Sequence, residues 1–189
     1  MLNNTAKIIV VSAPSGAGKT SILKHILSTY KNIIFSVSAT TRPKRDYEVD
    51  GVDYFFLSKE EFEEKIRNNE FIEYEKFYDN YYGTLKKFVD DNLGKGLSVI
   101  LEIDVNGASN IKKIYPDAVT IFIAPPNIET LIERLKSRNT EDEESLRKRI
   151  ERFEYELSFA DKYDYKIVND KLDVAIKDFE NILKKENII

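Results

Sequence analysis

The chain has no cysteine and only one histidine among its 189 residues. Without cysteine there is no disulfide framework, no cysteine-ligated zinc site and no thiol nucleophile, a composition that suits a reducing cytoplasm. The single histidine, His25, falls on a helical pattern but away from its apolar stripe, so we interpret it as a solvated surface residue. The sequence therefore offers neither a thiol nor an evident histidine for catalysis.

Long apolar runs and an excess of positive charge are missing as well. The first residues, MLNNTAK, lack the apolar stretch of a secretory signal, and no run approaches the ~20 residues of a membrane span. A net charge of −4 argues against a general nucleic-acid or anionic-membrane binder. With 42% hydrophobic residues the chain can bury one core. We expect a single-domain cytoplasmic protein without nucleic-acid or membrane partners.

Residues 7–26, KIIVVSAPSGAGKTSILKHI, predict a buried strand, a tight loop and a helix that begins near Thr20. The loop matches the pattern GxxxxGK[ST] at Gly18, Lys19 and Thr20, although Ala13 replaces the first glycine. Backbone N–H groups and the helix N-terminus form an anion site there, Lys19 adds a charge, and the Thr20 hydroxyl can bind Mg²⁺. A methyl group at Ala13 is tolerated where φ is negative. The strand and helix on either side favour a nucleotide-phosphate loop over a turn that binds nothing.

Apolar runs alternate with helical patterns along the rest of the chain. The strand-like runs are residues 33–35, 71–74, 97–103, 119–124 and 165–168. The helical patterns are residues 58–71 with a capping box at Ser58 and Glu61, 85–94, 128–136, a helix opened by Thr140 and Glu143, and a C-terminal helix with an apolar stripe of Leu172, Ile176, Phe179 and Leu183. Residues 80–84 are predicted to form a turn. This alternation predicts an α/β fold with a mostly parallel central sheet flanked by helices.

Two segments carry charged side chains with a chemical interpretation. Arg42 and Arg45 flank Pro43 on a loop or edge strand, where their forked donors can hold a phosphate; alternatively, the loop is only solvated. Glu73 lies on an otherwise apolar strand, so it either faces solvent or accepts hydrogen bonds from a ligand.

Glu102 and Asp104 end the most apolar strand, where a carboxylate can meet Mg²⁺ or a bound ligand. By alternation we expect both to point the same way. The alternative for Asp104 is a helix cap. Arg134 and Arg138 share one helix face, and the next helix carries Arg147, Arg149 and Arg152. Two such helices suit a lid that closes over phosphates, or a merely solvated hairpin.

Four segments in this order resemble guanylate kinases of the bacterial type: SAPSGAGKT (12–20), SATTRPKRDYEVDGVDY (38–54), FIEYEKFYDNYYGT (71–84) and LEIDVNGA (101–108). The resemblance extends over residues 6–185. It implies a P-loop kinase fold in one domain, residues 5–188, with a core (5–36, 86–127 and 160–188), a GMP-binding lobe of short strands (37–85) and a helical lid (128–159).

The resemblance also implies roles for individual residues. The expected ATP site is Ser15, Gly16, Ala17, Gly18, Lys19, Thr20, Ser21, Arg134, Arg138 and Asn169, the last beside adenine. The expected GMP site holds the phosphate with Arg42, Arg45, Tyr54 and Tyr82, the guanine with Ser38, Glu73 and Thr84, and includes Glu102 and Asp104. The expected catalytic residues are Lys19, Arg42, Asp104, Arg138 and Arg149, with Mg²⁺ on Thr20 and, through water, on Asp104.

The activity that this resemblance implies is ATP-dependent phosphorylation of GMP, and of dGMP, to the diphosphate in purine nucleotide metabolism. The sequence leaves the oligomeric state open between a monomer and a homodimer. One carboxylate, Glu73, can accept both N–H groups on the guanine edge, whereas AMP leaves it unpaired. Two alternatives stay open. One is a kinase for AMP or UMP, and the other is a non-catalytic module of guanylate-kinase-like fold that binds partner proteins. The intact Lys19–Thr20 loop and the arginines favour an enzyme.

Overall fold

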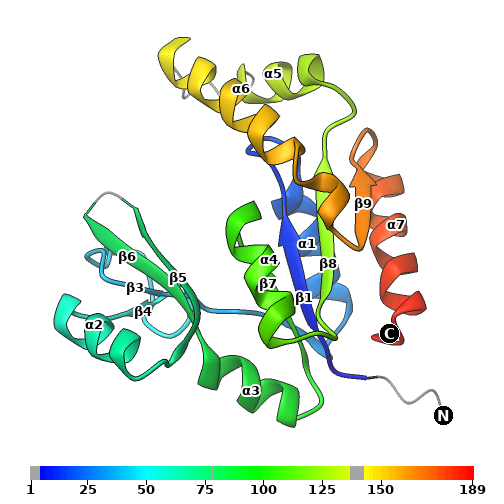
Figure 1. Cartoon of the computed structure of the whole chain (residues 1–189). Coiled ribbons are helices and arrows are strands. Elements are labelled where there is room, and N and C mark those ends of the chain that lie inside the picture. Colours follow the sequence, from blue (N-terminus) through cyan, green and yellow to red (C-terminus); the bar gives the residue numbers. More distant parts are fainter. Residues whose placement is uncertain (1–4, 78, 137–142) are drawn as a thin grey trace.

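The computed structural model describes residues 5–77, 79–136 and 143–189. Its strands form two separate sheets, one of five strands and one of four. Figure 1 shows the larger sheet between helices, the smaller sheet to one side of it, and two further helices, α5 and α6, beyond one end of the larger sheet.

The larger sheet is entirely parallel, as the alternation of strands and helices predicts. Its strands lie in the order β2 (Ile33–Phe35), β7 (Ser98–Glu102), β1 (Ile8–Ser12), β8 (Val119–Ala124) and β9 (Tyr165–Val168). Every residue of β1 and β8 is buried, because both faces of a parallel sheet are covered by helices. The central strands therefore form a rigid support for the loops that leave their carboxyl ends.

Strand alternation sends the side chains of β1 to two different cores. Ile9 packs with α1 (Lys19–Thr29) and α7 (Leu172–Lys185) on one face of the sheet. Ile8 and Val10 pack with α3 (Lys86–Gly94) and α4 (Val105–Ile114) on the other. His25 is exposed on α1, as predicted, with Nε2 3.8 Å from Glu180 Oε1 of α7. Each face of the sheet is thus sealed by its own pair of helices.

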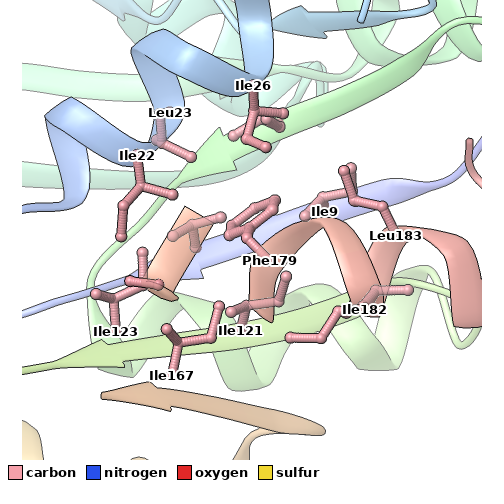
Figure 2. Close-up of a cluster of buried hydrophobic side chains, with 14 of the residues drawn as sticks. Ile9, Ile22, Leu23, Ile26, Ile121, Ile123, Ile167, Phe179, Ile182 and Leu183 are labelled. Carbon is pink, nitrogen blue, oxygen red and sulfur yellow. The ribbon is translucent and has the colours of Figure 1, made fainter. Parts of the chain in front are cut away.

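The C-terminal helix differs in part from its predicted apolar stripe. Phe179 and Leu183 are fully buried, whereas Leu172 is 45% exposed at the start of the helix. Ala175 and Ile182 are buried in its place. Figure 2 shows Phe179 at the centre of this core, among Ile9, Ile26 and Ile121. The predicted stripe is therefore buried along the last turns of α7, whereas its first residue, Leu172, is exposed.

The smaller sheet differs from the prediction in one segment, which forms a strand where a turn was predicted. Its strands lie in the order β4 (Phe55–Phe56), β3 (Ala39–Thr40), β6 (Asn80–Leu85) and β5 (Phe71–Phe77). Residues 80–84, predicted as a turn, are strand β6, which pairs antiparallel with β5. Two tyrosines and a threonine in this segment favour extended backbone and find a partner strand, which outweighs the asparagine and glycine turn signals.

Helix α2 (Lys59–Arg67) covers the smaller sheet and begins as predicted. The Ser58 hydroxyl accepts a hydrogen bond from Glu61 N, and the Glu61 carboxylate accepts one from Ser58 N, at 3.1 and 2.7 Å. The helix ends at Arg67, short of the predicted end at residue 71. Phe62 stacks on Phe71 with ring centroids 4.2 Å apart, which docks the helix on β5.

Two helices, α5 (Ile128–Lys136) and α6 (Glu143–Leu157), pack against each other through Leu131, Leu135 and Phe153. A 3₁₀ turn, Ala160–Lys162, returns the chain from α6 to β9. The predicted capping residue Thr140 lies outside the described residues. Across the described ranges, no helix combines the length and apolarity that crossing a membrane requires.

The core around Phe179 generates a prediction about stability. Phe179→Ala should lower the free energy of unfolding by about 3–5 kcal/mol, because it leaves a cavity between α1, α7 and the sheet. Urea denaturation followed by circular dichroism measures the change. The control Leu172→Ala, on the exposed start of the same helix, should change it by less than about 0.5 kcal/mol. Equal effects of the two substitutions would contradict this packing.

Candidate active site

The loop between β1 and α1 has the backbone that phosphate binding requires. Gly16 and Gly18 have φ values of 90° and 89°, in the left-handed region that favours glycine. Ala13 is not among the described non-glycine residues with positive φ, so its methyl group is tolerated as predicted. Ser12 Oγ donates a 2.6 Å hydrogen bond to Ile103 O, which joins the start of the loop to the end of β7.

Lys19 begins α1, one residue earlier than predicted, and its ammonium contacts a carboxylate across the site. Its Nζ lies 2.6 Å from Glu102 Oε1 at the end of β7, a strand paired directly with β1. The Glu102 side chain is 42% exposed, so solvent screens this ion pair and an incoming phosphate can compete for the lysine. Thr20 and Ser21 are exposed on the first turn of α1, beside this pair.

The far end of the same loop is held by residues distant in sequence. Asn169, at the end of β9, is buried and donates from Nδ2 to Ala17 O at 2.7 Å. On the other side, Arg149 of α6 donates a hydrogen bond to Ser15 Oγ. The structure therefore brings two residues expected from the resemblance, Asn169 and Arg149, onto the phosphate loop itself.

The remaining arginines of α5 and α6 divide into two groups. Arg134 Nη2 donates to Asp170 O at 3.2 Å, next to Asn169. Arg147 and Arg152 instead pair with glutamates one turn away on their own helix, Glu151 and Glu156. The solvated interpretation thus suits Arg147, whose side chain is 76% exposed, whereas Arg152 pairs with the buried Glu156. The candidate Arg138 lies outside the described residues.

Three of the expected phosphate ligands lie together beside the smaller sheet, around Glu48, a residue that the sequence analysis did not single out. Glu48, 7% exposed, binds both terminal nitrogens of Arg42, at 3.0 and 2.6 Å. Arg42 accordingly holds the pKa of the Glu48 carboxyl below its usual range. The guanidinium lies over the Tyr54 ring, 5.4 Å from its centroid, and the Tyr54 and Tyr82 rings are 6.2 Å apart. Arg42, Tyr54 and Tyr82 therefore form one cluster with Glu48.

Arg45 joins this cluster only through its backbone. Its N–H donates to Glu48 Oε2 at 2.8 Å, whereas its exposed guanidinium donates to the Tyr47 hydroxyl. In the sequence Glu48 is one of several acids that follow the basic residues of this loop, and this pattern also fits a solvated residue. Sequence spacing gives no indication of its burial.

Glu73 lies opposite Thr84 in the register of β5 and β6. Thr84 Oγ1 donates to Glu73 Oε1 at 2.7 Å, and Thr84 is buried. Burial raises the pKa of the Glu73 carboxyl, and the nearby charge of Asp104 raises it further. Ser38 is partly buried at the start of β3, where its carbonyl accepts from Phe55 N.

Glu73 opens into a cavity of about 560 Å³ between β5 and α4. Asp104, Asn106 and Gly107 line its other wall. Tyr155 of α6 donates its hydroxyl to Asn106 Oδ1 at 2.8 Å, so the helix pair α5–α6 contacts this wall directly. No sequence pattern pointed to Tyr155 or Asn106, which lie 49 residues apart.

Asp104 caps α4, which confirms the alternative interpretation of this residue. Its Oδ1 accepts a 2.8 Å hydrogen bond from Gly107 N, the N-cap contact of a helix that begins at Val105. Strand β7 ends at Glu102, so strand alternation does not extend to Asp104. The two acids have different contacts: Glu102 pairs with Lys19, and Asp104 lines the Glu73 cavity.

A family model described as guanylate kinase matches residues 5–186. A guanylate kinase of Chlorobium luteolum is 49% identical over 177 residues, which cover 93% of this chain and 90% of that protein. One of Carboxydothermus hydrogenoformans is 48% identical and covers 96% of this chain and 89% of that protein. A crystal structure of guanylate kinase from Anaplasma phagocytophilum superposes with a TM-score of 0.73 at 34% identity, covering 99% of this chain and 89% of that one.

The environment of Glu73 predicts how stability depends on pH. Because the folded protein raises this pKa, the ionised carboxylate destabilises the fold at pH values above its unfolded pKa, about 4.3. Glu73→Gln keeps an acceptor for Thr84, so it should be more stable than wild type at pH 7. The difference should vanish below about pH 3, where Glu73 is protonated in both states.

Urea denaturation at both pH values measures this difference. Glu75→Gln, at an exposed site on the same strand, is the matched control and should change stability less. A Glu73→Gln protein that is less stable than wild type at pH 7 would contradict the assigned cost of burying this carboxylate.

Proposed function

The chain belongs to the guanylate kinase family, and on that premise we propose which of its residues carry out phosphoryl transfer from ATP to GMP. The protein is an ATP-dependent phosphotransferase that converts GMP to GDP, with GMP and ATP as its substrates. The reaction requires base recognition, phosphate binding, a metal ion and relief of charge repulsion, and we assign each of these to residues of this chain.

Glu73 is the residue that selects guanine. The observation that carries this assignment is the Thr84 hydrogen bond to Glu73 Oε1, which fixes the carboxylate at the rim of the cavity between β5 and α4. Guanine presents two donors on one edge, N1–H and the exocyclic amine, and a carboxylate accepts from both. Adenine presents a lone pair at N1 and lacks that amine, so AMP leaves the charge unpaired. Ser38 and Asp104 complete the base site.

The GMP phosphate binds at Arg42, Arg45, Tyr54 and Tyr82. Glu48 holds the Arg42 guanidinium in a fixed plane through two hydrogen bonds, which limits the side-chain entropy lost when the phosphate arrives. The Tyr54 ring packs beside the same guanidinium. dGMP shares the base and phosphate contacts, and we include it among the substrates.

The ATP phosphates bind in the loop of Ser15, Gly16, Ala17, Gly18, Lys19, Thr20 and Ser21. Lys19 exchanges Glu102 for the phosphates, since that ion pair is partly open to solvent. Arg134 and Arg149 approach from α5 and α6, and the contact of Arg149 with Ser15 supports its placement at the loop. Arg138, on the segment between these helices, is assigned the same role from the resemblance alone.

Mg²⁺ is proposed at the Thr20 hydroxyl, with Asp104 acting through water. Within the described ranges, no three acidic or histidine side chains gather around a common point. Mg²⁺ in kinases takes few protein ligands, because substrate phosphates and water supply the rest, so an exposed hydroxyl next to the Lys19–Glu102 pair suits it. When bound, the ion neutralises charge on the transferring phosphates.

The acceptor phosphate needs no general base, since its second pKa of ~6 leaves it ionised at neutral pH. The main barrier is the approach of two polyanions in line. Lys19, Arg42 and Arg149 oppose that repulsion with positive charge held at fixed positions. Closure of α5 and α6 excludes water that would otherwise hydrolyse ATP.

We divide residues 5–188 into a core (5–36, 86–127 and 160–188), a GMP-binding lobe (37–85) and a lid (128–159). The separation of the two sheets and the packing of α5 against α6 support this division. We also propose a cytoplasmic location, within purine nucleotide metabolism, where both substrates are available.

Removing the loop lysine tests the catalytic assignment. Lys19→Ala should lower kcat by about 10²–10³-fold, because it deletes a charge aimed at the transferring group. A coupled assay for ADP formation measures the loss. Lys24→Ala, an exposed lysine on the same helix, should behave as wild type. Unchanged phosphoryl transfer in a folded Lys19→Ala protein would overturn the assignment and favour a non-catalytic binding module.

A panel of GMP, AMP, UMP and CMP tests the base site. The wild-type protein should favour GMP over AMP in kcat/KM by about 10⁴-fold. Glu73→Gln should lose about 10²-fold in kcat/KM for GMP without a matching loss for AMP, because the amide accepts only one of the two guanine donors. Glu75→Gln serves as the control. A wild-type preference for AMP or UMP, or an unaffected Glu73→Gln enzyme, would refute the role of Glu73.

A further inference from the structure

Asn169 has contacts that its expected place beside adenine does not explain. It is 4% exposed at the carboxyl end of β9. Its backbone N–H donates to Ala124 O at 2.7 Å, and its side-chain Nδ2 donates to Ala17 O at the same distance. Backbone and side chain are therefore both fixed, one on the neighbouring strand and the other on the phosphate loop.

The amide also lies directly against Gly18. A Cβ atom built on Gly18 would stand 2.2 Å from Asn169 Nδ2, far inside any van der Waals contact. Gly18 has a φ of 89°, so backbone conformation and space both require glycine at this position. Asn169 and Gly18 therefore fit together as a pair, although they are far apart in the sequence.

The hydrogen bond to Ala17 O determines where the next N–H points. A trans peptide is planar, and its C=O and N–H groups point in opposite directions. When Asn169 holds the Ala17 carbonyl toward β9, the Gly18 N–H points in the opposite direction within the same peptide plane. That N–H belongs to the set of loop amides that bind phosphate.

We propose that Asn169 is a positioning residue for the phosphate loop, which acts through the Ala17–Gly18 peptide rather than by reading the adenine base. This inference rests on the ATP site proposed above. Because Asn169 is 4% exposed, little of its amide surface is open to a base. The next residue, Asp170, accepts a hydrogen bond from Arg134 of α5 through its carbonyl, so the end of β9 ties the loop and the helix pair together.

Two substitutions distinguish the effect of losing the hydrogen-bond donor of Asn169 from the effect of changing its side-chain volume. Asn169→Asp keeps the shape but places an oxygen against Ala17 O, where no donor remains once the carboxylate is ionised. Asn169→Ala removes the donor without adding charge, and it keeps the test valid if the aspartate variant fails to fold. Asn181→Asp, an exposed position on α7, is the matched control for the charge change.

The experiment compares the full-length wild type with these three variants. It measures kcat and KM with ATP and with ITP, the inhibition constant of inorganic tripolyphosphate against ATP, the KM for GMP, and the thermal midpoint. ITP differs from ATP on the base edge that an amide would read, and tripolyphosphate has no base at all.

A positioning role predicts the same loss for both donors. kcat/KM should fall by about 10²-fold with ATP and with ITP in Asn169→Asp, and tripolyphosphate should inhibit more weakly. Asn169→Ala should change in the same direction. The KM for GMP should stay the same, and Asn181→Asp should match wild type.

Two results would overturn the proposal. A changed ratio of ATP to ITP activity with unchanged tripolyphosphate inhibition would identify a contact with adenine. A lower thermal midpoint with unchanged kinetic constants would identify a purely structural residue. If the wild type itself fails to phosphorylate GMP, the proposed function fails instead, and direct calorimetric binding of tripolyphosphate to wild type and Asn169→Ala still decides the role of Asn169.

Discussion

The site depends first on one backbone turn, between the central strand β1 and helix α1. Gly18 holds a left-handed φ of 89° immediately before Lys19, where α1 begins. This turn aims the loop amides, the helix N-terminus and the lysine at the same point. Three hydrogen bonds hold the loop around this turn. Ser12 Oγ donates to Ile103 O, Arg149 donates to Ser15 Oγ, and Asn169 Nδ2 donates to Ala17 O. Ile103 and Asn169 directly follow strands of the parallel sheet, whereas Arg149 lies on α6.

Two positive charges of the site are neutralised before any substrate arrives. Glu102 pairs with Lys19, and Glu48 pairs with Arg42. These two carboxylates differ in exposure: the Glu102 side chain is 42% exposed, whereas that of Glu48 is 7% exposed. Glu102 is therefore a partner that a phosphate can replace, while Glu48 is a permanent support that orients its arginine.

On the guanine side of the site, the carboxylate contacts a neutral hydrogen-bond donor, whereas Glu102 and Glu48 contact cations. Glu73 accepts its hydrogen bond from the neutral hydroxyl of Thr84, and its carboxyl is partly buried near the charge of Asp104. The raised pKa of Glu73 reflects the cost of holding a negative charge ready for the two guanine donors.

Local patterns in the sequence predict much of this structure. β8 and α5 have the predicted bounds because β8 is a nearly unbroken apolar run and α5 has a strong helical periodicity, and because turns or polar residues mark their ends. The prediction for β6 is wrong because Asn80 and Gly83 are turn formers, and only pairing with β5 decides the outcome. Asp104 follows a buried strand, where an acid suits a ligand site as well as a helix cap. The contact of Glu48 with Arg42 could not be predicted, because the burial of Glu48 leaves no local pattern in the sequence. The contact of Asn169 with Ala17 could not be predicted either, because it joins residues 152 positions apart.

The central claim is that this chain divides recognition between a phosphate loop for ATP and a carboxylate for guanine. A crystal structure of the complex with GMP and a non-hydrolysable ATP analogue tests it most directly. We expect Glu73 oxygens within about 3.2 Å of guanine N1 and the exocyclic amine, Arg42 on the GMP phosphate, and Lys19 on the ATP phosphates. Guanine bound away from Glu73, or Lys19 still paired with Glu102 while ATP occupies the site, would contradict it.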